Sequence, residues 1–101
     1  MDSAILFAAE LGDAPTIDLH GLTVNVAIQE LETFAHQQLM SGERAIKIIH
    51  GHGSQKLRDA VWNWLATQRR AGLVSSYKDA DALGQSVAVK YSALENLKRR
   101  G

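Results

Sequence analysis

Two short segments of this 101-residue chain contain side chains of the kinds that transfer protons or bind phosphate. In the first, Asp18 and His20 are two apart within residues 16–20, which alternate polar and apolar. Along an extended strand both side chains point to the same side, with Cα atoms about 6.6 Å apart. Such a pair can orient each other, share a metal ion, or hold a phosphodiester between a base and an acid. The alternative is structural: Asp18 caps a neighbouring loop and His20 hydrogen-bonds a backbone carbonyl.

The second segment is His50-Gly51-His52-Gly53-Ser54, which precedes a predicted helix. Glycine allows positive φ and close approach to the backbone, and the first amides of a helix have no partner within it. Two cations follow in the first turn, where they oppose the helix dipole by about 0.3–1 kcal/mol each unless an anion is bound. The glycines alone also suit an ordinary turn. The pattern as a whole predicts a phosphate site formed by Gly51, His52, Gly53, Ser54, Lys56 and Arg58.

A metal site is a weaker prediction. The chain has four histidines and no cysteine, which excludes zinc sites built on thiolates. An H-x-H pair with a distant D-x-H pair is a weak signal for zinc, whereas a Mg or Mn ion held mostly by Asp18, phosphate and water suits the oxygen ligands present. The sequence establishes no cofactor for certain; Mg or Mn is the candidate, with Asp18 as its ligand.

The charges of the chain are unevenly distributed although its formal net charge is zero. Residues 1–43 contain seven acids and no Lys or Arg, whereas residues 44–101 contain eleven cations and four acids. This asymmetry hints at nucleic acid or membrane contact, although charge blocks are commonly solvated faces. No apolar run approaches the roughly 18 residues of a membrane span, so we expect no membrane partner. The absence of cysteine fits a cytoplasmic protein.

Periodicity predicts a βαβαββ order after a short N-terminal helix. A right-handed crossover makes the first two strands parallel and most simply neighbours, so their carboxyl ends and the residues that follow them share one sheet edge. Alternation predicts helices on one face, with Thr16, Asp18, Lys47 and Lys90 on the open face. The expected elements are a helix over 2–12, strands over 16–20, 45–49, 73–78 and 86–92, and helices over 24–41 and from about 54 to 71.

The two segments resemble the "LDLHG" and "HGxG" motifs of the small MutS-related (Smr) domain. Here they read Ile17-Asp18-Leu19-His20-Gly21 and Ile48-Ile49-His50-Gly51-His52-Gly53, and the resemblance covers about residues 15–91. It implies an α/β fold, an α+β two-layer sandwich like the C-terminal domain of bacterial translation initiation factor three. It also implies action on nucleic acid, by nicking DNA or cleaving RNA. Asp18 and His20 then fall at the catalytic position and the His50–Gly53 loop at the nucleic-acid contact.

The resemblance suggests three segments and shows one departure. We expect an N-terminal helical extension over 1–14, an Smr-like domain over 15–92 and a basic tail over 93–101. Smr domains also occur as C-terminal modules of larger proteins, so a larger parent protein is expected as one context. The family's "GGxG" stretch is replaced by Ala82-Leu83-Gly84-Gln85-Ser86, which contains one glycine and leaves substrate preference open.

The leading hypothesis is a phosphodiester endonuclease, a hydrolase acting on DNA or RNA. In it His20 is general base or acid, Asp18 orients His20 or a metal ion, and His50 is the second proton-transfer group, although strand parity with Ile46 and Ile48 turns His50 toward the helices. RNA supplies its own 2′-hydroxyl nucleophile, whereas DNA needs an activated water. The first alternative is a DNA- or RNA-binding module without catalysis, on a ribosome or in DNA repair or recombination. The second is a protein-interaction domain that uses the N-terminal helix and Trp62.

Overall fold

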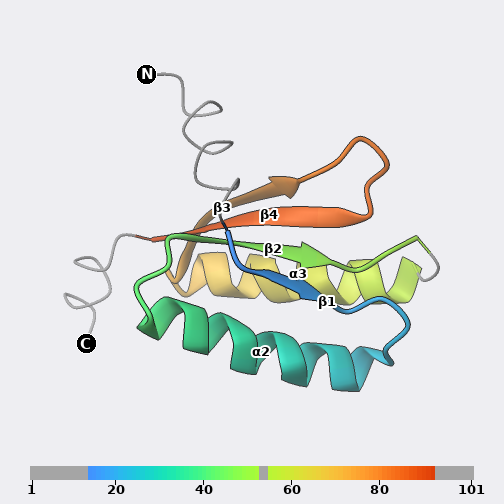
Figure 1. Cartoon of the computed structure of the whole chain (residues 1–101), viewed down its shortest axis with the longest axis horizontal. Helices are drawn as coiled ribbons and strands as arrows, with labels where there is room; N and C mark the ends of the chain where they lie inside the picture. Colours follow the sequence, from blue (N-terminus) through green and yellow to red (C-terminus); the bar gives the residue numbers. More distant parts are fainter. Residues whose placement is uncertain (1–13, 53–54, 93–101) are drawn as a thin grey trace.

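A computed structural model describes residues 14–52 and 55–92 (Figure 1). The predicted N-terminal helix and basic tail lie outside this part of the chain. The elements are β1 (Thr16–Asp18), α2 (Val24–Met40), β2 (Ala45–Ile49), α3 (Gln55–Arg70), β3 (Val74–Asp79) and β4 (Ser86–Tyr91). No helix among the described residues is long and apolar enough to cross a membrane.

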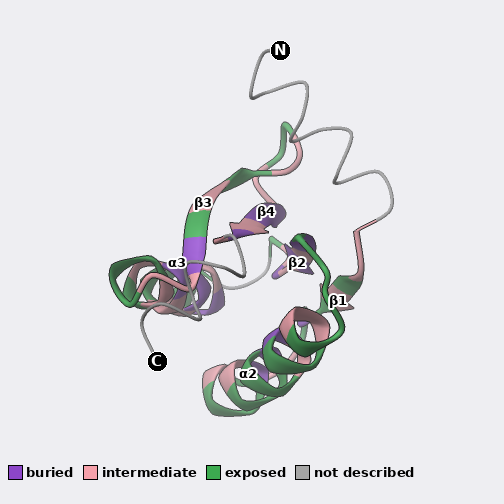
Figure 2. Ribbon diagram, turned by 90° about the vertical axis from the view of Figure 1, so that its left-hand side faces the viewer, coloured by how far each residue is buried: buried purple, intermediate pink, exposed green. Residues whose placement is uncertain are grey.

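The strands form one mixed sheet in the order β1-β2-β4-β3. β1 and β2 are parallel neighbours, as the crossover rule predicts, and β4 pairs antiparallel with both β2 and β3. Both helices lie on the same side of the sheet, which is plainest when the sheet is seen end-on (Figure 2). The predicted fold class, a mixed α+β sheet with helices on one face, is confirmed.

Helix α2 begins at Val24, as its sequence predicts, and ends at Met40, one residue before the predicted end. The hydroxyl of Thr23 accepts a hydrogen bond from the Val26 amide at the N-cap, and Gly42, at φ +86°, follows the last turn. Its buried side chains are Ala27, Leu31 and Ala35, spaced four residues apart along one stripe. α3 buries Leu57, Val61 and Leu65 at the same spacing.

The core lies between this pair of helices and the inner face of the sheet. The alternate residues Ile46 and Ile48 of β2 and Val87 and Val89 of β4 are fully buried against the helices. Tyr91 ends this row at 7% exposure and donates a hydrogen bond from its phenol to the backbone carbonyl of Ala35, 3.0 Å away. β4 is thereby joined directly to α2.

The first strand is shorter than its alternating pattern predicts. Residues 16–20 were expected to be extended, but β1 ends at Asp18. The reason is local hydrogen bonding: Asp18 Oδ1 accepts from the amide of His20 at 3.1 Å, and the Leu22 amide donates to the Leu19 carbonyl at 3.2 Å. The chain therefore turns at His20 and Gly21, and His20 lies in a turn instead of the sheet.

Replacing Tyr91 with Phe should cost about 0.5–1.5 kcal/mol of unfolding free energy at neutral pH, because one buried hydrogen bond is lost. Burial also raises the pKa of the Tyr91 phenol. Above about pH 10 the phenol ionises in the unfolded chain and stays protonated in the fold, so the native protein loses stability as pH rises. Tyr91→Phe removes this loss. The difference in unfolding free energy between variant and wild type, measured by urea titration, should therefore shrink at high pH.

Leu31→Ala is the matched control, because it opens the same core from α2 without changing a titratable group. It should cost about 2–5 kcal/mol and keep the pH dependence of the wild type. If the difference in unfolding free energy between Tyr91→Phe and wild type stays constant from pH 7 to pH 11, the phenol of Tyr91 is not held protonated in the fold.

Candidate active site

The two chemistry-bearing segments meet at the edge formed by the ends of β1 and β2. The Leu19 amide donates to the Ile49 carbonyl at 2.7 Å, which continues the parallel ladder past the end of β1. Gly51 has φ +78°, and a Cβ built on it would lie 3.0 Å from the Cβ of His20. Thirty residues of sequence separate these groups, and the parallel pairing brings them into contact.

Asp18 and His20 form the closest side-chain pair at this edge. His20 Nδ1 is 2.6 Å from Asp18 Oδ1, and the same oxygen accepts the His20 backbone amide. Because a carboxylate only accepts hydrogen bonds, Nδ1 must carry the proton, and Nε2 of the neutral ring then has a lone pair. These hydrogen bonds, the side-chain bond first, lower the pKa of Asp18, which stays ionised. The side chains remain 70% and 47% exposed for His20 and Asp18, so both are accessible to a substrate.

Two adjacent hollows open at this edge. The larger, of about 700 Å³, is lined by residues from both segments and from the loop before β4. The smaller, of about 260 Å³, lies at the start of α3 and shares Gly51 and His52 with it. Together they form a groove from the Asp18–His20 pair to the first turn of α3. The first hollow is lined by Asp18, His20, Gly21, Leu22, Ile49, His50, Gly51, His52, Leu57 and Gln85, and the second by Gly51, His52, Gln55, Arg58, Leu83 and Gly84.

His50 is buried, with 1% exposure, as the strand parity predicts. Its Nδ1 is 3.1 Å from the Gly51 carbonyl, so this nitrogen also carries the proton. Its Nε2 is buried without a hydrogen-bond partner, although the residue lines the larger hollow. Unsatisfied buried nitrogens are rare in folded proteins, so this one is a candidate point of contact for a bound molecule.

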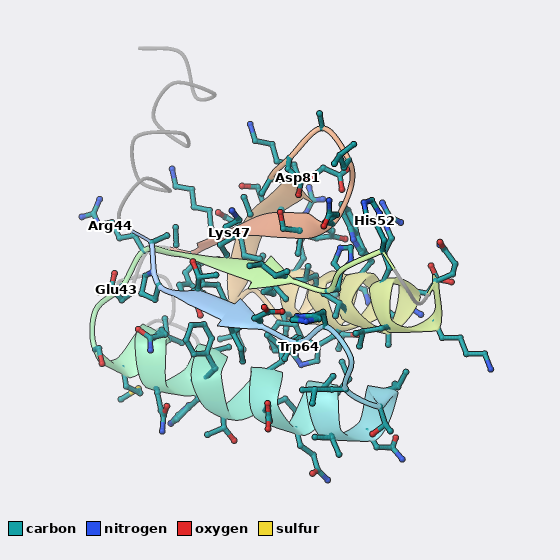
Figure 3. The ribbon with its side chains drawn as sticks, turned by 45° about the vertical axis from the view of Figure 1, so that its right-hand side comes forward. Glu43, Arg44, Lys47, His52, Trp64 and Asp81 are labelled. Carbon is teal, nitrogen blue, oxygen red and sulfur yellow. The ribbon has the colours of Figure 1, made fainter. Side chains whose placement is uncertain are left out.

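Part of the predicted phosphate-binding loop is used for hydrogen bonds within the fold, and part of it faces the groove. The amides of His50 and Gly51 both donate to the Gln85 carbonyl, at 3.0 and 2.9 Å, so the Gly51 amide is used within the fold. His52 is exposed and lies on the groove side, facing the loop that carries Asp81 (Figure 3). Gly53 and Ser54 lie outside the described residues.

The two predicted phosphate-binding cations differ in their surroundings. Arg58 lines the smaller hollow, with Nη2 3.6 Å from Asp79 Oδ1 and its guanidinium 5.0 Å from the centre of the Trp62 ring. Trp62 in turn packs edge-on against Tyr77, at 5.3 Å between ring centres. These contacts hold the guanidinium beside the groove. Lys56 is exposed and lines neither hollow.

The loop before β4 contains a residue that sequence reasoning missed. Asp81 Oδ1 accepts the amides of Leu83 and Gln85, at 2.9 and 3.2 Å, and Oδ2 accepts the hydroxyl of Ser86. These bonds, led by that of Ser86, lower the pKa of Asp81. Asp81 thereby fixes Gln85, whose carbonyl holds the His50 and Gly51 amides. The available signal was an Asp two residues before Leu83 in a turn, the pattern of an Asx-turn.

The donor set does not fit a resident Mg or Mn ion. Among residues 14–52 and 55–92, no group of three or more His, Asp or Glu side chains can hold one ion. Asp18 is one carboxylate, and its Oδ1 already accepts two hydrogen bonds. Hard cations take several oxygen ligands, and the described side chains at this edge do not supply them. Mg or Mn at Asp18, with phosphate and water as further ligands, stays a prediction.

Comparison with known proteins agrees with the resemblance seen in the motifs. A family model described as the Smr domain matches residues 17–92. The chain is 37% identical over 65 residues to proteins named Endonuclease MutS2 from Aquifex aeolicus and from Symbiobacterium thermophilum. Each match covers 64% of this chain and 8% of the relative, so the chain corresponds to a small part of those proteins.

Two solved structures have the same fold. The Smr domain of Thermus thermophilus MutS2 superposes with a TM-score of 0.70 at 28% identity, covering 79% of this chain and 100% of that one. YdaL, a stand-alone small MutS-related protein from Escherichia coli, gives a TM-score of 0.72 at 22% identity, covering 92% of this chain and 78% of that one.

Gly51→Ala should destabilise the fold more than Gly42→Ala. Both sites have positive φ, so each substitution costs about 1–2 kcal/mol in backbone strain. A Cβ at Gly42 meets nothing within 4 Å, whereas at Gly51 it meets His20 Cβ at 3.0 Å. Urea unfolding of both variants measures the difference.

A double-mutant cycle isolates the contact between the two segments. His20→Gly removes the opposing Cβ, so Gly51→Ala in that background should cost only the strain seen at Gly42. If Gly51→Ala costs the same with and without His20, the segments do not meet as described.

Proposed function

Because the chain belongs to the Smr domain family, we propose that it is an endonuclease that cleaves phosphodiester bonds of nucleic acid at the Asp18–His20 pair. One observation carries this proposal: an exposed imidazole with its Nδ1 2.6 Å from a carboxylate, at the rim of a hollow large enough for a nucleotide. The relatives named endonucleases support it.

His20 is the proton-transfer group in the proposed mechanism. Asp18 holds the Nδ1 proton, so Nε2 can take a proton from the attacking oxygen, and the carboxylate stabilises the imidazolium that forms. The attacking oxygen then forms a bond to phosphorus as the bond to the leaving oxygen breaks. The leaving oxygen accepts a proton from a second group.

His50 and His52 are the candidates for that second group. The buried Nε2 of His50 has no hydrogen-bond partner and His50 lines the larger hollow, whereas His52 is exposed and lines both hollows. We keep His50 as the proposed group: the Gly51 carbonyl holds its Nδ1–H, so it must act as the imidazolium, whose Nε2–H gives its proton to the leaving oxygen and leaves the neutral ring.

The phosphate is proposed to bind at the start of α3. The positive end of the helix dipole and the side chains of His52 and Arg58 favour an anion in the smaller hollow. Gly53, Ser54 and Lys56 remain proposed contributors from the sequence pattern. Within the described loop, the Gly51 amide is committed to Gln85, so Gly51 contributes mainly by its lack of a side chain.

Asp18→Ala and His20→Ala should each lower the cleavage rate by about 10²–10⁴-fold, because general acid–base catalysis is lost, while nucleic-acid binding is kept. Cleavage of labelled RNA and DNA oligonucleotides and fluorescence anisotropy measure the two properties. His36→Ala is the matched control: an exposed histidine on α2 that lines neither hollow, so it should cleave at the wild-type rate. Cleavage that survives in the Asp18→Ala/His20→Ala double variant would contradict the assignment of these two residues as the catalytic pair. Binding without cleavage by the wild-type chain would favour a binding module.

Product ends should separate the two nucleophiles. If RNA is cut through its own 2′-hydroxyl, the products carry 2′,3′-cyclic phosphate and 5′-hydroxyl ends, and cleavage persists in EDTA. If water attacks with metal activation, cleavage stops in EDTA and returns with Mg or Mn. Because the described donor set does not fit a resident ion, we expect the first result on RNA. Loss of RNA cleavage in EDTA would contradict it.

A further inference from the structure

The loop between β3 and β4 carries an exposed apolar side chain beside the candidate active site. Among the described residues, three large apolar side chains are exposed, and Leu83 is one of them at 68%. The other two, Val26 and Met40, belong to α2 and line neither hollow of the groove. Leu83 lines the smaller hollow, at the start of α3. Exposed leucines are common on protein surfaces, so the surroundings of this one decide what it can do.

Hydrogen bonds within the loop hold Leu83 in place. Its amide donates to Asp81 Oδ1 at 2.9 Å, and the Gly84 amide donates to the Asp81 carbonyl at 3.3 Å. The Gln85 amide and the Ser86 hydroxyl donate to the same carboxylate. The apolar side chain therefore projects from an ordered loop, and binding a molecule against it costs little further ordering of the backbone.

The smaller hollow combines polar and apolar surfaces from different elements. Helix α3 contributes Gln55 and Arg58, and the Arg58 guanidinium is held 5.0 Å from the centre of the Trp62 ring. The loop before β4 contributes Leu83 and Gly84. Because glycine has no side chain, the surface that this loop adds to the hollow is largely that of the leucine.

A nucleotide has the same two kinds of surface. Its phosphate suits the start of α3 and Arg58, whereas its base has a flat apolar face. A leucine adds nothing to phosphate binding but packs against bases, as in proteins that insert apolar side chains between base steps. Inside a duplex, stacked neighbours cover both faces of each base. Leu83 can therefore reach the face of a base only where the nucleotide is unpaired and unstacked.

From this arrangement we propose that Leu83 forms a nucleobase subsite, and that the substrate class is a strand with an unpaired nucleotide at this position. The proposal deepens the proposed function and rests on it. The nucleotide in the smaller hollow has its phosphate at the start of α3 and its base against Leu83. The strand then continues along the groove to the Asp18–His20 pair.

The test compares Leu83→Ala with the matched control Met40→Ala. Both remove an apolar side chain of similar exposure, 68% and 71%, but Met40 ends α2 and lines neither hollow. Fluorescence anisotropy is measured in a His20→Ala background, so that cleavage does not interfere. The three labelled probes are a single-stranded oligonucleotide, the same strand in a full duplex, and a single strand with abasic sugar–phosphate units in place of its central nucleotides. Melting curves check that the variants fold.

Leu83→Ala should bind the single strand on the order of tenfold more weakly than its parent, because the apolar area of one leucine is no longer buried against a base. It should bind the duplex and the abasic strand as tightly as its parent, since neither presents an open base face. Met40→Ala should keep the affinity of its parent for all three probes. If Leu83→Ala binds the abasic strand equally weakly, or the single strand normally, the proposal is overturned, because Leu83 then contacts the sugar–phosphate backbone or nothing.

Two further outcomes separate this inference from the proposed function. A chain with His20 intact that binds the single strand through Leu83 but does not cleave it supports the nucleobase subsite and refutes the endonuclease. A chain that cleaves single strand and duplex at equal rates, with no change in Leu83→Ala, refutes the nucleobase subsite alone. A wild-type chain that binds none of the three probes refutes both.

Discussion

The parallel pairing of β1 with β2 is the contact on which the candidate site depends. It is a short ladder of three aligned residue pairs, extended by the bond from the Leu19 amide to the Ile49 carbonyl. Without it, Asp18 and His20 would have no fixed relation to a loop thirty residues away. Gly51 makes the approach tight, since its missing side chain leaves room for the Cβ of His20. Gly51 is therefore a structural requirement of the edge at which we propose that cleavage takes place.

The same edge is held from its other side by the loop before β4. Asp81 accepts hydrogen bonds from the amides of Leu83 and Gln85, and the Gln85 carbonyl accepts hydrogen bonds from two amides of the His50 loop. The family pattern has more glycine in this stretch. A carboxylate that accepts several hydrogen bonds orders the loop without those glycines, so this chain reaches a defined loop by side-chain bonding.

In the proposed function, local charge lets a chain with no net charge bind a polyanion. Arg58 lies beside the smaller hollow at the start of α3, while Asp18 at the same edge is paired with His20. Affinity should be modest and sensitive to salt. Recognition would then depend on substrate shape or on other parts of a larger protein, in keeping with MutS2 relatives of which this chain matches a small part.

The sequence by itself determined the order of elements and, except at the end of β1, their bounds to within about one residue. It also determined the parallel neighbours β1 and β2 and the meeting of the two motifs at one edge, because periodicity and crossover handedness are local rules. Only the tertiary structure decided that β1 ends at Asp18, that the Gly51 amide is given to Gln85, and that Asp81 orders the last loop. It also decided that β4 lies between β2 and β3, which puts Lys47 and Lys78 on either side of Ala88. These features depend on which strands become neighbours and which hydrogen bonds compete, and residue spacing along the chain does not contain that information.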